Sequence, residues 1–214
     1  MKLYIHNYCP FSTRCLYVAN YLSIPVEVMN LHYYDESTTT QIAGEHIVPM
    51  LLYKGKVITG YHEIMECFIN SAEVSESPIV SKEVMLWQEK ALPIYRAIVY
   101  PRFMHVEGRD FEKEYSQNKF IERNQYASFN FDDLIERSDD IGREATEIIH
   151  DAKHIILQQQ CGITELADQA VFFSILRGYT MLPKLQTEEF MNRWLHSAAK
   201  ITNLNLMIAQ SLNA

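Results

Sequence analysis

Cysteine is scarce in this sequence. Among its 214 residues the only cysteines are Cys9, Cys15, Cys67 and Cys161. This number is too small for the disulfide framework of a small secreted domain. We therefore expect reduced thiols whose role, if any, is chemical. Cys67 and Cys161 lack a basic or helix-start setting and are expected in the core.

Long apolar runs and an excess of basic residues are also missing. No apolar run approaches the roughly 18 residues of a membrane-spanning helix, and the first residues lack the apolar region and cleavage site of a signal peptide. The formal net charge is -8, and acidic residues outnumber basic ones both before and after Glu73. This balance disfavours nucleic acids and anionic membranes as partners. We expect a cytoplasmic protein that works without either.

What the chain does have is ample apolar material for a core, at 48% of its residues. Its first part alternates short segments of two kinds: strands are predicted over 2–6, 26–29, 50–53 and 57–58, and helices over 10–22, 35–43 and 62–70. Gly55 between the last two strands indicates a hairpin. A strand–helix–strand unit followed by two strands and a helix is the thioredoxin-like arrangement.

The rest of the chain shows apolar residues at helical spacing and no convincing strand. Helices are predicted over 81–100 with a bend at Pro93, over 131–157, from about 164–168 onward, over 187–196 and over 198–212. The helix that begins at about 164–168 is apolar enough to be the central helix of this part. A polar segment ending in Ser-Pro separates the two parts. The predicted organisation is an α/β domain over 1–72, a linker over 73–80 and an all-helical domain over 81–214.

The segment Cys9-Pro10-Phe11-Ser12 lies where the first strand gives way to the first helix. With Cys9 as N-cap and Pro10 as the first helical residue, the free amides of Phe11 and Ser12 point at the Cys9 sulfur. Such a setting commonly lowers the pKa of a cysteine. The motif therefore predicts a nucleophilic Cys9 thiolate. The alternative is a small buried thiol without a chemical role.

Further sequence blocks accompany this motif: M-K-L-Y-I at 1–5, I-V-P at 47–49, Y-P-R-F at 100–103 and N-F-D-D-L-I-E-R-S-D at 130–139. With the two-domain organisation they resemble the glutathione transferase fold and, more closely, the bacterial glutaredoxin 2 family, over nearly the whole chain. The resemblance implies glutathione as co-substrate and a redox-active Cys9. It also implies a cis peptide bond at Val48-Pro49, which would face the thiol and offer the Val48 backbone to glutathione.

The chain departs from the family's pattern in two places. The family's usual C-P-Y-C motif closes a disulfide with its second cysteine, and that position is Ser12 here. Cys15 is a poor substitute, because six residues of helix rise about 9 Å and a disulfide needs Cα atoms within about 7 Å. The acidic residue and serine that hold the γ-glutamyl end of glutathione in this fold are replaced by Gly60 and Tyr61. The helix amides there are still able to bind a carboxylate.

By this resemblance the contacts to glutathione would come from Pro10, Phe11, Arg14, Val48, Pro49, Gly60 and Tyr61. Arg14 is alternatively a solvated helix arginine, and His6 is either a base or a structural strand residue. His150 and His154 have metal-ligand spacing but no third ligand, so no metal site is predicted.

These observations favour an oxidoreductase. The Cys9 thiolate would take glutathione from a protein–glutathione mixed disulfide and be freed by a second glutathione, a monothiol cycle that Ser12 permits. The partners would be glutathione and glutathionylated or disulfide-bearing proteins, and the enzyme a monomer. The alternatives are a transferase-like enzyme that holds an electrophile, or a non-catalytic binding module. Iron–sulfur cluster binding is disfavoured, because monothiol glutaredoxins that hold clusters have glycine at the position of Pro10.

Overall fold

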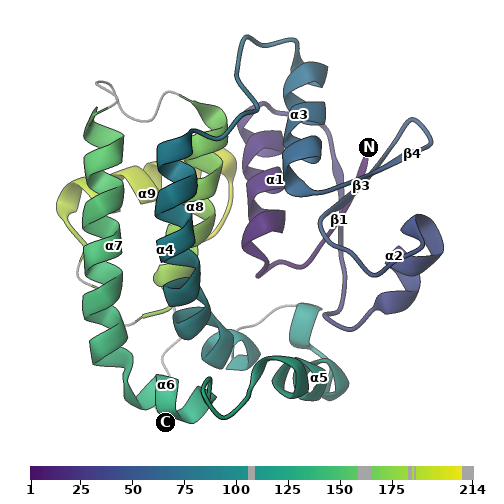
Figure 1. The fold of residues 1–214 in the computed structure, drawn as a ribbon. Helices are drawn as coiled ribbons and strands as arrows, with labels where there is room; N and C mark the ends of the chain where they lie inside the picture. The colour runs from purple at the N-terminus through teal and green to yellow at the C-terminus, as the bar shows by residue number, and fades with distance from the viewer. Residues whose placement is uncertain (106–108, 159–164, 183–184, 186, 209–214) are drawn as a thin grey trace.

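The computed structural model describes residues 1–105, 109–158, 165–182, 185 and 187–208 (Figure 1). An α/β part and a helical part lie side by side and meet where α1 packs on α8. Within the described residues, no helix has the length and apolar character needed to cross a bilayer.

A four-stranded sheet organises the first part. Its strands are β1 (Lys2–Ile5), β2 (Glu27–Asn30), β3 (Met50–Tyr53) and β4 (Lys56–Thr59), in the order β2-β1-β3-β4. β1 runs parallel to β2 and antiparallel to β3, with Leu3 opposite both Val28 and Leu51. Gly55, at φ 75°, forms the predicted tight turn between β3 and β4.

The alternation of side chains along β1 assigns the helices to opposite faces of the sheet. Leu3 and Ile5 belong to the main core with α1 (Pro10–Tyr21) and α3 (Tyr61–Ala72). Tyr4 points the other way and packs in a small cluster with Ile42 of α2 (Glu36–Ala43). The helices therefore sandwich the sheet, and the predicted pattern of strands and helices is confirmed.

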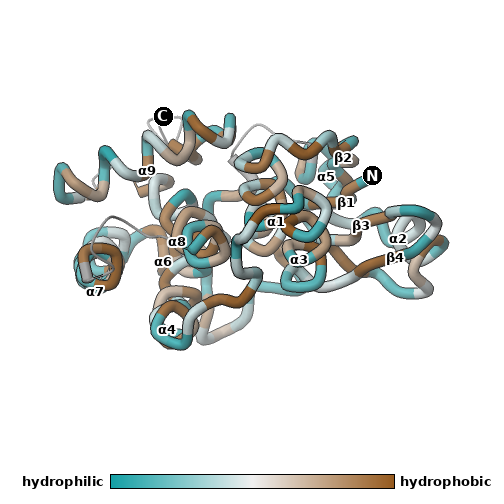
Figure 2. The backbone as a smooth tube through the Cα atoms, turned by 90° about the horizontal axis from the view of Figure 1, so that it is seen from above, coloured by the Kyte–Doolittle hydropathy of each residue, from teal (hydrophilic) through white to brown (hydrophobic). Residues whose placement is uncertain are grey.

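From Lys82 on, the described residues form helices joined by loops. They are α4 (Lys82–Val99), the 3-10 helices η1 (Tyr100–His105) and η2 (Arg109–Phe111), α5 (Glu114–Asn124), α6 (Phe131–Glu136), α7 (Ser138–Gln158), α8 (Leu166–Tyr179) and α9 (Glu189–Thr202). α8 is buried along its length apart from Gln169. Seen from above, it lies between α1, α4, α7 and α9 (Figure 2). The predicted central helix is thus confirmed.

The helix predictions for this part fail in three places. The helix expected over 131–157 is interrupted at Arg137, which leaves the helical conformation (φ -85°, ψ 16°) and whose amide donates to the Asp133 and Ile135 carbonyls. The Ser138 hydroxyl also donates to the Ile135 carbonyl. The two helices expected over 187–196 and 198–212 are one helix, α9, which ends at Asn203 in the left-handed region. Residues 209–212 of that prediction lie outside the described residues. α5 was not predicted, because it buries only Ser116 and Phe120.

Candidate functional site

Cys9 is the N-cap of α1, directly after β1 and the loop of residues 6–8. Its backbone is extended (φ -72°, ψ 121°), Pro10 opens the helix, and the Thr13 amide donates to the Cys9 carbonyl at 3.0 Å. The Thr13 hydroxyl donates to the same carbonyl at 3.1 Å. The Cys9 side chain is half-buried. The strand, turn and helix start expected from the sequence are confirmed.

The net electrostatic effect on Cys9 is the reverse of the one predicted. Burial raises the pKa of the Cys9 thiol above its ordinary value. The Ser12 amide and hydroxyl, the Phe11 amide and the charge of Arg14 all act to lower this pKa, as the helix-start argument requires, but they do not outweigh desolvation. The predicted low pKa is therefore wrong, because sequence reasoning placed the donors but not the apolar surroundings of the sulfur.

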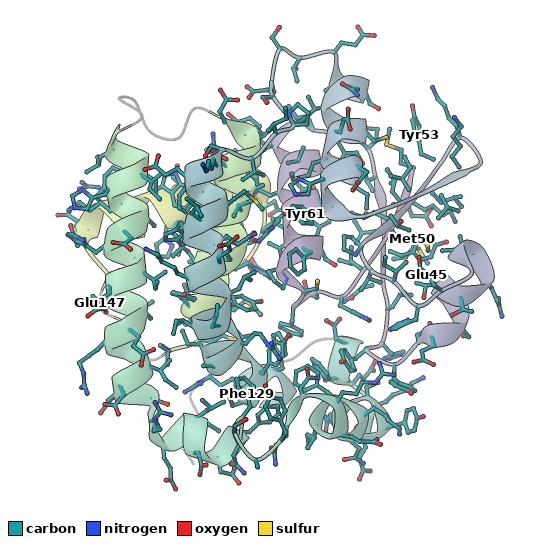
Figure 3. All side chains as sticks on the ribbon, in the orientation of Figure 1. Glu45, Met50, Tyr53, Tyr61, Phe129 and Glu147 are labelled. Carbon is teal, nitrogen blue, oxygen red and sulfur yellow. The ribbon has the colours of Figure 1, made fainter. Side chains whose placement is uncertain are left out.

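Those surroundings are a cavity of about 710 Å³ between the two parts of the chain. Cys9, Pro10 and Phe11 line it on the α/β side, and more than half of its lining residues are phenylalanine or tyrosine. Tyr8 and Phe103 have ring centroids 5.0 Å apart across the boundary between the parts. Phe129, labelled in Figure 3, lines the cavity from the segment between α5 and α6. The cavity therefore suits an apolar or aromatic group held beside the Cys9 sulfur.

The helical part also holds the backbone that leads into Cys9. The Tyr8 amide donates to Asp110 Oδ2 at 3.2 Å, and the Tyr95 hydroxyl donates to the Tyr8 carbonyl at 2.8 Å. Arg177 Nη1 donates to the Asn7 carbonyl at 3.1 Å. Sequence reasoning missed these residues. The one available signal was that Arg177 is a charge inside the apolar run of α8.

Two titratable side chains of the cavity are buried and shifted toward their neutral forms. Burial raises the pKa of Asp110 to about 6 and lowers the pKa of His6 to about 4. His6 Nδ1 lies 3.3 Å from the Leu31 carbonyl oxygen, which only accepts, so the neutral ring carries its proton there. Of the two roles left open for His6, the structural one fits this contact.

Of the residues predicted to contact glutathione, Pro10 and Phe11 line the cavity and the others do not. The Val48-Pro49 peptide bond is cis, as predicted, but neither residue lines the cavity. Gly60 is the N-cap of α3 at φ 86° and offers no side chain. At this positive φ any residue with a side chain is strained, so the backbone at Gly60 disfavours the family's acidic residue. A Cβ there would also lie 2.3 Å from Glu63 Oε2, which is the end of a flexible side chain. Tyr61 sits between the two parts of the chain, as Figure 3 shows.

Arg14 is not a solvated helix residue. Its side chain has no exposed surface, and its guanidinium carbon lies 4.8 Å and 4.6 Å from the ring centroids of Phe11 and Tyr61, which stack on each other with centroids 5.3 Å apart. Its Nε donates to Ser174 Oγ of α8 at 3.1 Å. The guanidinium therefore crosses the interface between the two parts instead of facing solvent.

Among the described residues, neither Cys15 nor Cys67 provides a second reactive thiol beside Cys9. Cys15 is fully buried, its Sγ donates to the Tyr61 carbonyl at 3.9 Å, and burial raises its pKa well above the ordinary value. Cys67 is half-buried on α3, with a pKa that burial also raises. Cys161 lies outside the described residues. The His150 and His154 rings meet edge to face with centroids 4.6 Å apart, and no group of three or more potential ligands for a metal ion occurs in the described ranges.

Comparisons with known proteins show which proteins this chain is similar to. Residues 83–211 match the family described as glutaredoxin 2, C-terminal domain, and residues 8–70 match the glutathione S-transferase N-terminal domain. Glutaredoxin 2 of Escherichia coli (strain K12) is 23% identical over 218 residues, covering 99% of this chain and 100% of that protein. A crystal structure of glutaredoxin 2 from Salmonella typhimurium in complex with glutathione superposes with a TM-score of 0.88 at 23% identity, covering 96% of each chain.

A more distant similarity extends to a transferase. Glutathione transferase GSTFuA3 from Phanerochaete chrysosporium matches with a TM-score of 0.71 at 11% identity, over 94% of this chain and 96% of that one. The fold is thus the glutathione transferase-like one, with a thioredoxin-like N-terminal domain followed by a helical C-terminal domain. Because the first family match spans more than half of the sequence, the conclusion is direct: the chain belongs to the glutaredoxin 2 family.

Proposed function

We propose that this protein is a glutathione-dependent thiol–disulfide oxidoreductase that reduces protein–glutathione mixed disulfides through Cys9 alone. The observation that carries the proposal is a half-buried Cys9 at the start of α1, on the wall of the cavity, with Ser12 at the position of the family's second cysteine. Cys15 lies six residues further along the same helix, a rise of about 9 Å, and is buried. A cycle with one cysteine therefore fits this site.

In the first step the Cys9 thiolate attacks the glutathione sulfur of the mixed disulfide. The substrate's sulfur–sulfur bond breaks, the protein thiol leaves as a thiolate and takes a proton from solvent, and Cys9 becomes joined to glutathione. In the second step a glutathione thiolate attacks the glutathione sulfur of this adduct. Glutathione disulfide leaves and the Cys9 thiolate is restored, so one disulfide is consumed and one is formed.

Glutathione binding is expected to be weak. Support for a site comes from the glutathione complex of the Salmonella typhimurium relative and from the amides at the start of α3. Gly60 and Tyr61 supply no carboxylate or hydroxyl like that of the usual acidic–serine pair, and the Gly60 backbone is strained for any other residue. A lost charge-assisted hydrogen bond is worth about 1.5–3 kcal/mol, or roughly ten- to a hundredfold in affinity.

The test is reduction of a glutathionylated peptide at millimolar glutathione. We expect measurable turnover that Cys9→Ser abolishes and Cys15→Ser leaves nearly unchanged. Glutathione disulfide should add one glutathione per chain, located on Cys9 by peptide mapping. Loss of activity in Cys15→Ser would show that Cys15 is a resolving thiol. Inactivity of the unaltered protein would favour a non-catalytic binding module.

The aromatic cavity favours a second candidate, a transferase-like reaction of glutathione with an apolar electrophile. A cavity of about 710 Å³ lined largely by aromatic rings has room for such a compound beside Cys9. Conjugation of a chlorodinitrobenzene, measured beside peptide reduction, separates the two. Conjugation that persists in Cys9→Ser while reduction is lost would support the transferase reading.

A further inference from the structure

Two hydrogen-bond acceptors on the wall of the aromatic cavity have no partner. Asp110 and His6 both line the cavity, with 1% and 7% of their surface exposed. Asp110 Oδ1 and His6 Nε2 form no hydrogen bond within the described residues. Because the neutral His6 ring carries its proton on Nδ1, its Nε2 only accepts. Buried polar atoms are normally hydrogen-bonded, so this wall suits a ligand that donates hydrogen bonds.

The Asp110 carboxyl also lacks a counter-ion. Its Oδ2 accepts from the Tyr8 amide at 3.2 Å, and the Asn7 amide and the Asn30 side chain bond the same carboxyl, but all three donors are neutral. None of the ion pairs between described residues includes Asp110. Arg177 interacts with it electrostatically, yet makes its own hydrogen bonds to two carbonyls and a hydroxyl. A buried carboxylate in this setting calls for a cation.

The other lining residues suit the stem and the charge of a basic side chain. Aromatic ring faces attract cations, and the Arg96 guanidinium already lies 5.1 Å and 5.4 Å from the ring centroids of Tyr100 and Phe129. Arg96 is exposed, so water and salt screen its charge. Glu89, also exposed, adds a carboxylate to the same lining. A lysine side chain packs its methylenes on apolar surface and carries three N–H donors and no acceptor.

We propose that the cavity selects a lysine side chain of the protein substrate, next to its glutathionylated cysteine. The methylenes lie among the aromatic rings, and the ammonium donates to Asp110 Oδ1 and His6 Nε2. The net charge of -8 favours the encounter with a basic partner. The use of this preference in turnover rests on the proposed function, but the binding preference itself does not.

Other side chains complement the cavity less well. A carboxylate would meet the like charges of Asp110 and Glu89. An uncharged apolar side chain would contact the rings but would leave both buried acceptors unpartnered. Norleucine and glutamate are therefore the two residues to compare with lysine.

The test uses three glutathionylated peptides that differ only in the residue after the cysteine, which is lysine, norleucine or glutamate. Their binding to Cys9→Ser, which cannot attack the mixed disulfide, is measured by titration calorimetry at pH 7.5 without free glutathione. We expect the lysine peptide to bind about tenfold more tightly than the norleucine peptide and the glutamate peptide to bind most weakly.

Asp110→Asn in the same background removes the charge but keeps an oxygen that accepts from the Tyr8 amide. We expect this variant to reduce the lysine preference to less than about twofold. Its affinity for the norleucine peptide should stay unchanged, which also shows that the cavity is still folded.

Asp168→Asn is the matched control. Asp168 is also a buried carboxyl with one unpartnered oxygen, and its Oδ1 accepts from the Ser81 amide at 2.8 Å. It does not line the cavity. This variant should keep the full lysine preference.

Three results would overturn the proposal: equal binding of the lysine and norleucine peptides to Cys9→Ser, no measurable binding of the lysine peptide, or a lysine preference that survives Asp110→Asn. The first two need no variant of Asp110. Turnover by the unaltered protein separates the proposal from the proposed function. A lysine preference in binding without reduction of any peptide would support the proposal and remove the oxidoreductase function. Reduction of all three peptides with equal affinities would do the reverse.

Discussion

At the scale of single residues, burial sets the charge state of the Cys9 cavity. Cys9 and Asp110 have raised pKa values and His6 a lowered one, and desolvation is the largest cause in each case. Every one of these shifts favours the neutral form of its group. Burial therefore shifts Cys9, Asp110 and His6 toward their neutral forms in a cavity whose lining also includes Glu89 and Arg96.

Asp110 and His6 make opposite contributions to the pH dependence of stability. Between pH 3.8 and about 6 the folded protein holds the Asp110 proton that the unfolded chain has released, so this contribution to the free energy of unfolding falls as pH rises. Between about 4 and 6.5 the unfolded chain holds the His6 proton that the folded protein has released, so this contribution rises. Each amounts to about 3 kcal/mol, and the two nearly cancel.

Single substitutions should expose the two opposing contributions. From pH 4 to 6, the free energy of unfolding of Asp110→Asn is expected to rise more steeply than that of the unaltered protein, and that of His6→Phe less steeply. Urea unfolding at several pH values measures both slopes. Asp132→Asn, on the exposed side of α6, serves as control and should run parallel to the unaltered protein. Equal slopes in all four proteins would contradict the assigned shifts.

The residues of the site show how far sequence reasoning reaches. The position of Cys9 at the helix start followed from Pro10 and the preceding apolar run, because helix starts obey local rules. The sign of its pKa shift did not follow, because the rings around the sulfur come from segments about a hundred residues away, such as Phe103 and Phe111. The burial of Arg14 escaped for the same reason, since Ser174 of α8 holds it.

At the scale of elements, the helices of the second part position the reactive loop of the first. Tyr95 of α4, Asp110 of η2 and Arg177 of α8 each bond the backbone of residues 7–8. This backbone leads directly into Cys9 and the first turn of α1. A shift of α4 or α8 is therefore expected to change the orientation of the α1 amides near the Cys9 sulfur. The helical part therefore helps to position the Cys9 thiol.

A pair of tyrosine substitutions tests this transmission. Tyr95→Phe removes the hydrogen bond to the Tyr8 carbonyl, and Tyr179→Phe removes a comparable buried bond, from its hydroxyl to the Ala91 carbonyl at 2.9 Å. Each is expected to lower the free energy of unfolding by about 1 kcal/mol. Only Tyr95→Phe should slow alkylation of Cys9, by up to about fivefold. Equal rates in the two variants would show that α4 does not position the loop.

Helices and strands were predicted correctly where their apolar residues recur at a clear spacing. The strands and helices up to Ala72 follow alternating or amphipathic patterns and were found within a few residues. The break at Arg137 was missed, because the apolar face continues across it from Leu134 to Ile141, both buried. α5 was missed because its surface is mostly polar and Phe120 is its only buried apolar residue.

At the scale of the whole molecule, one apolar core runs through both parts. The same cluster includes Leu3 and Ile5 of the sheet, Val18 of α1, and Phe172 and Ile175 of α8. Tyr17 of α1 adds a hydrogen bond from its hydroxyl to Gln169 Oε1 at 3.0 Å. We propose that residues 1–72 and 81–214 form two domains joined by a linker over 73–80, and that this shared core, rather than the linker, holds them together.

The two domains are accordingly expected to unfold as one unit. Scanning calorimetry should give a single transition whose calorimetric and van't Hoff enthalpies agree. A protease site placed at Ser75, in the exposed part of the linker, makes the test sharper. After cleavage the two fragments should still elute together and unfold in one transition, because α1 and α8 remain packed through buried side chains that the cut does not touch. Two separated transitions, or fragments that part on gel filtration, would show that the interface is weak and that the helical part does not hold the Cys9 loop in solution.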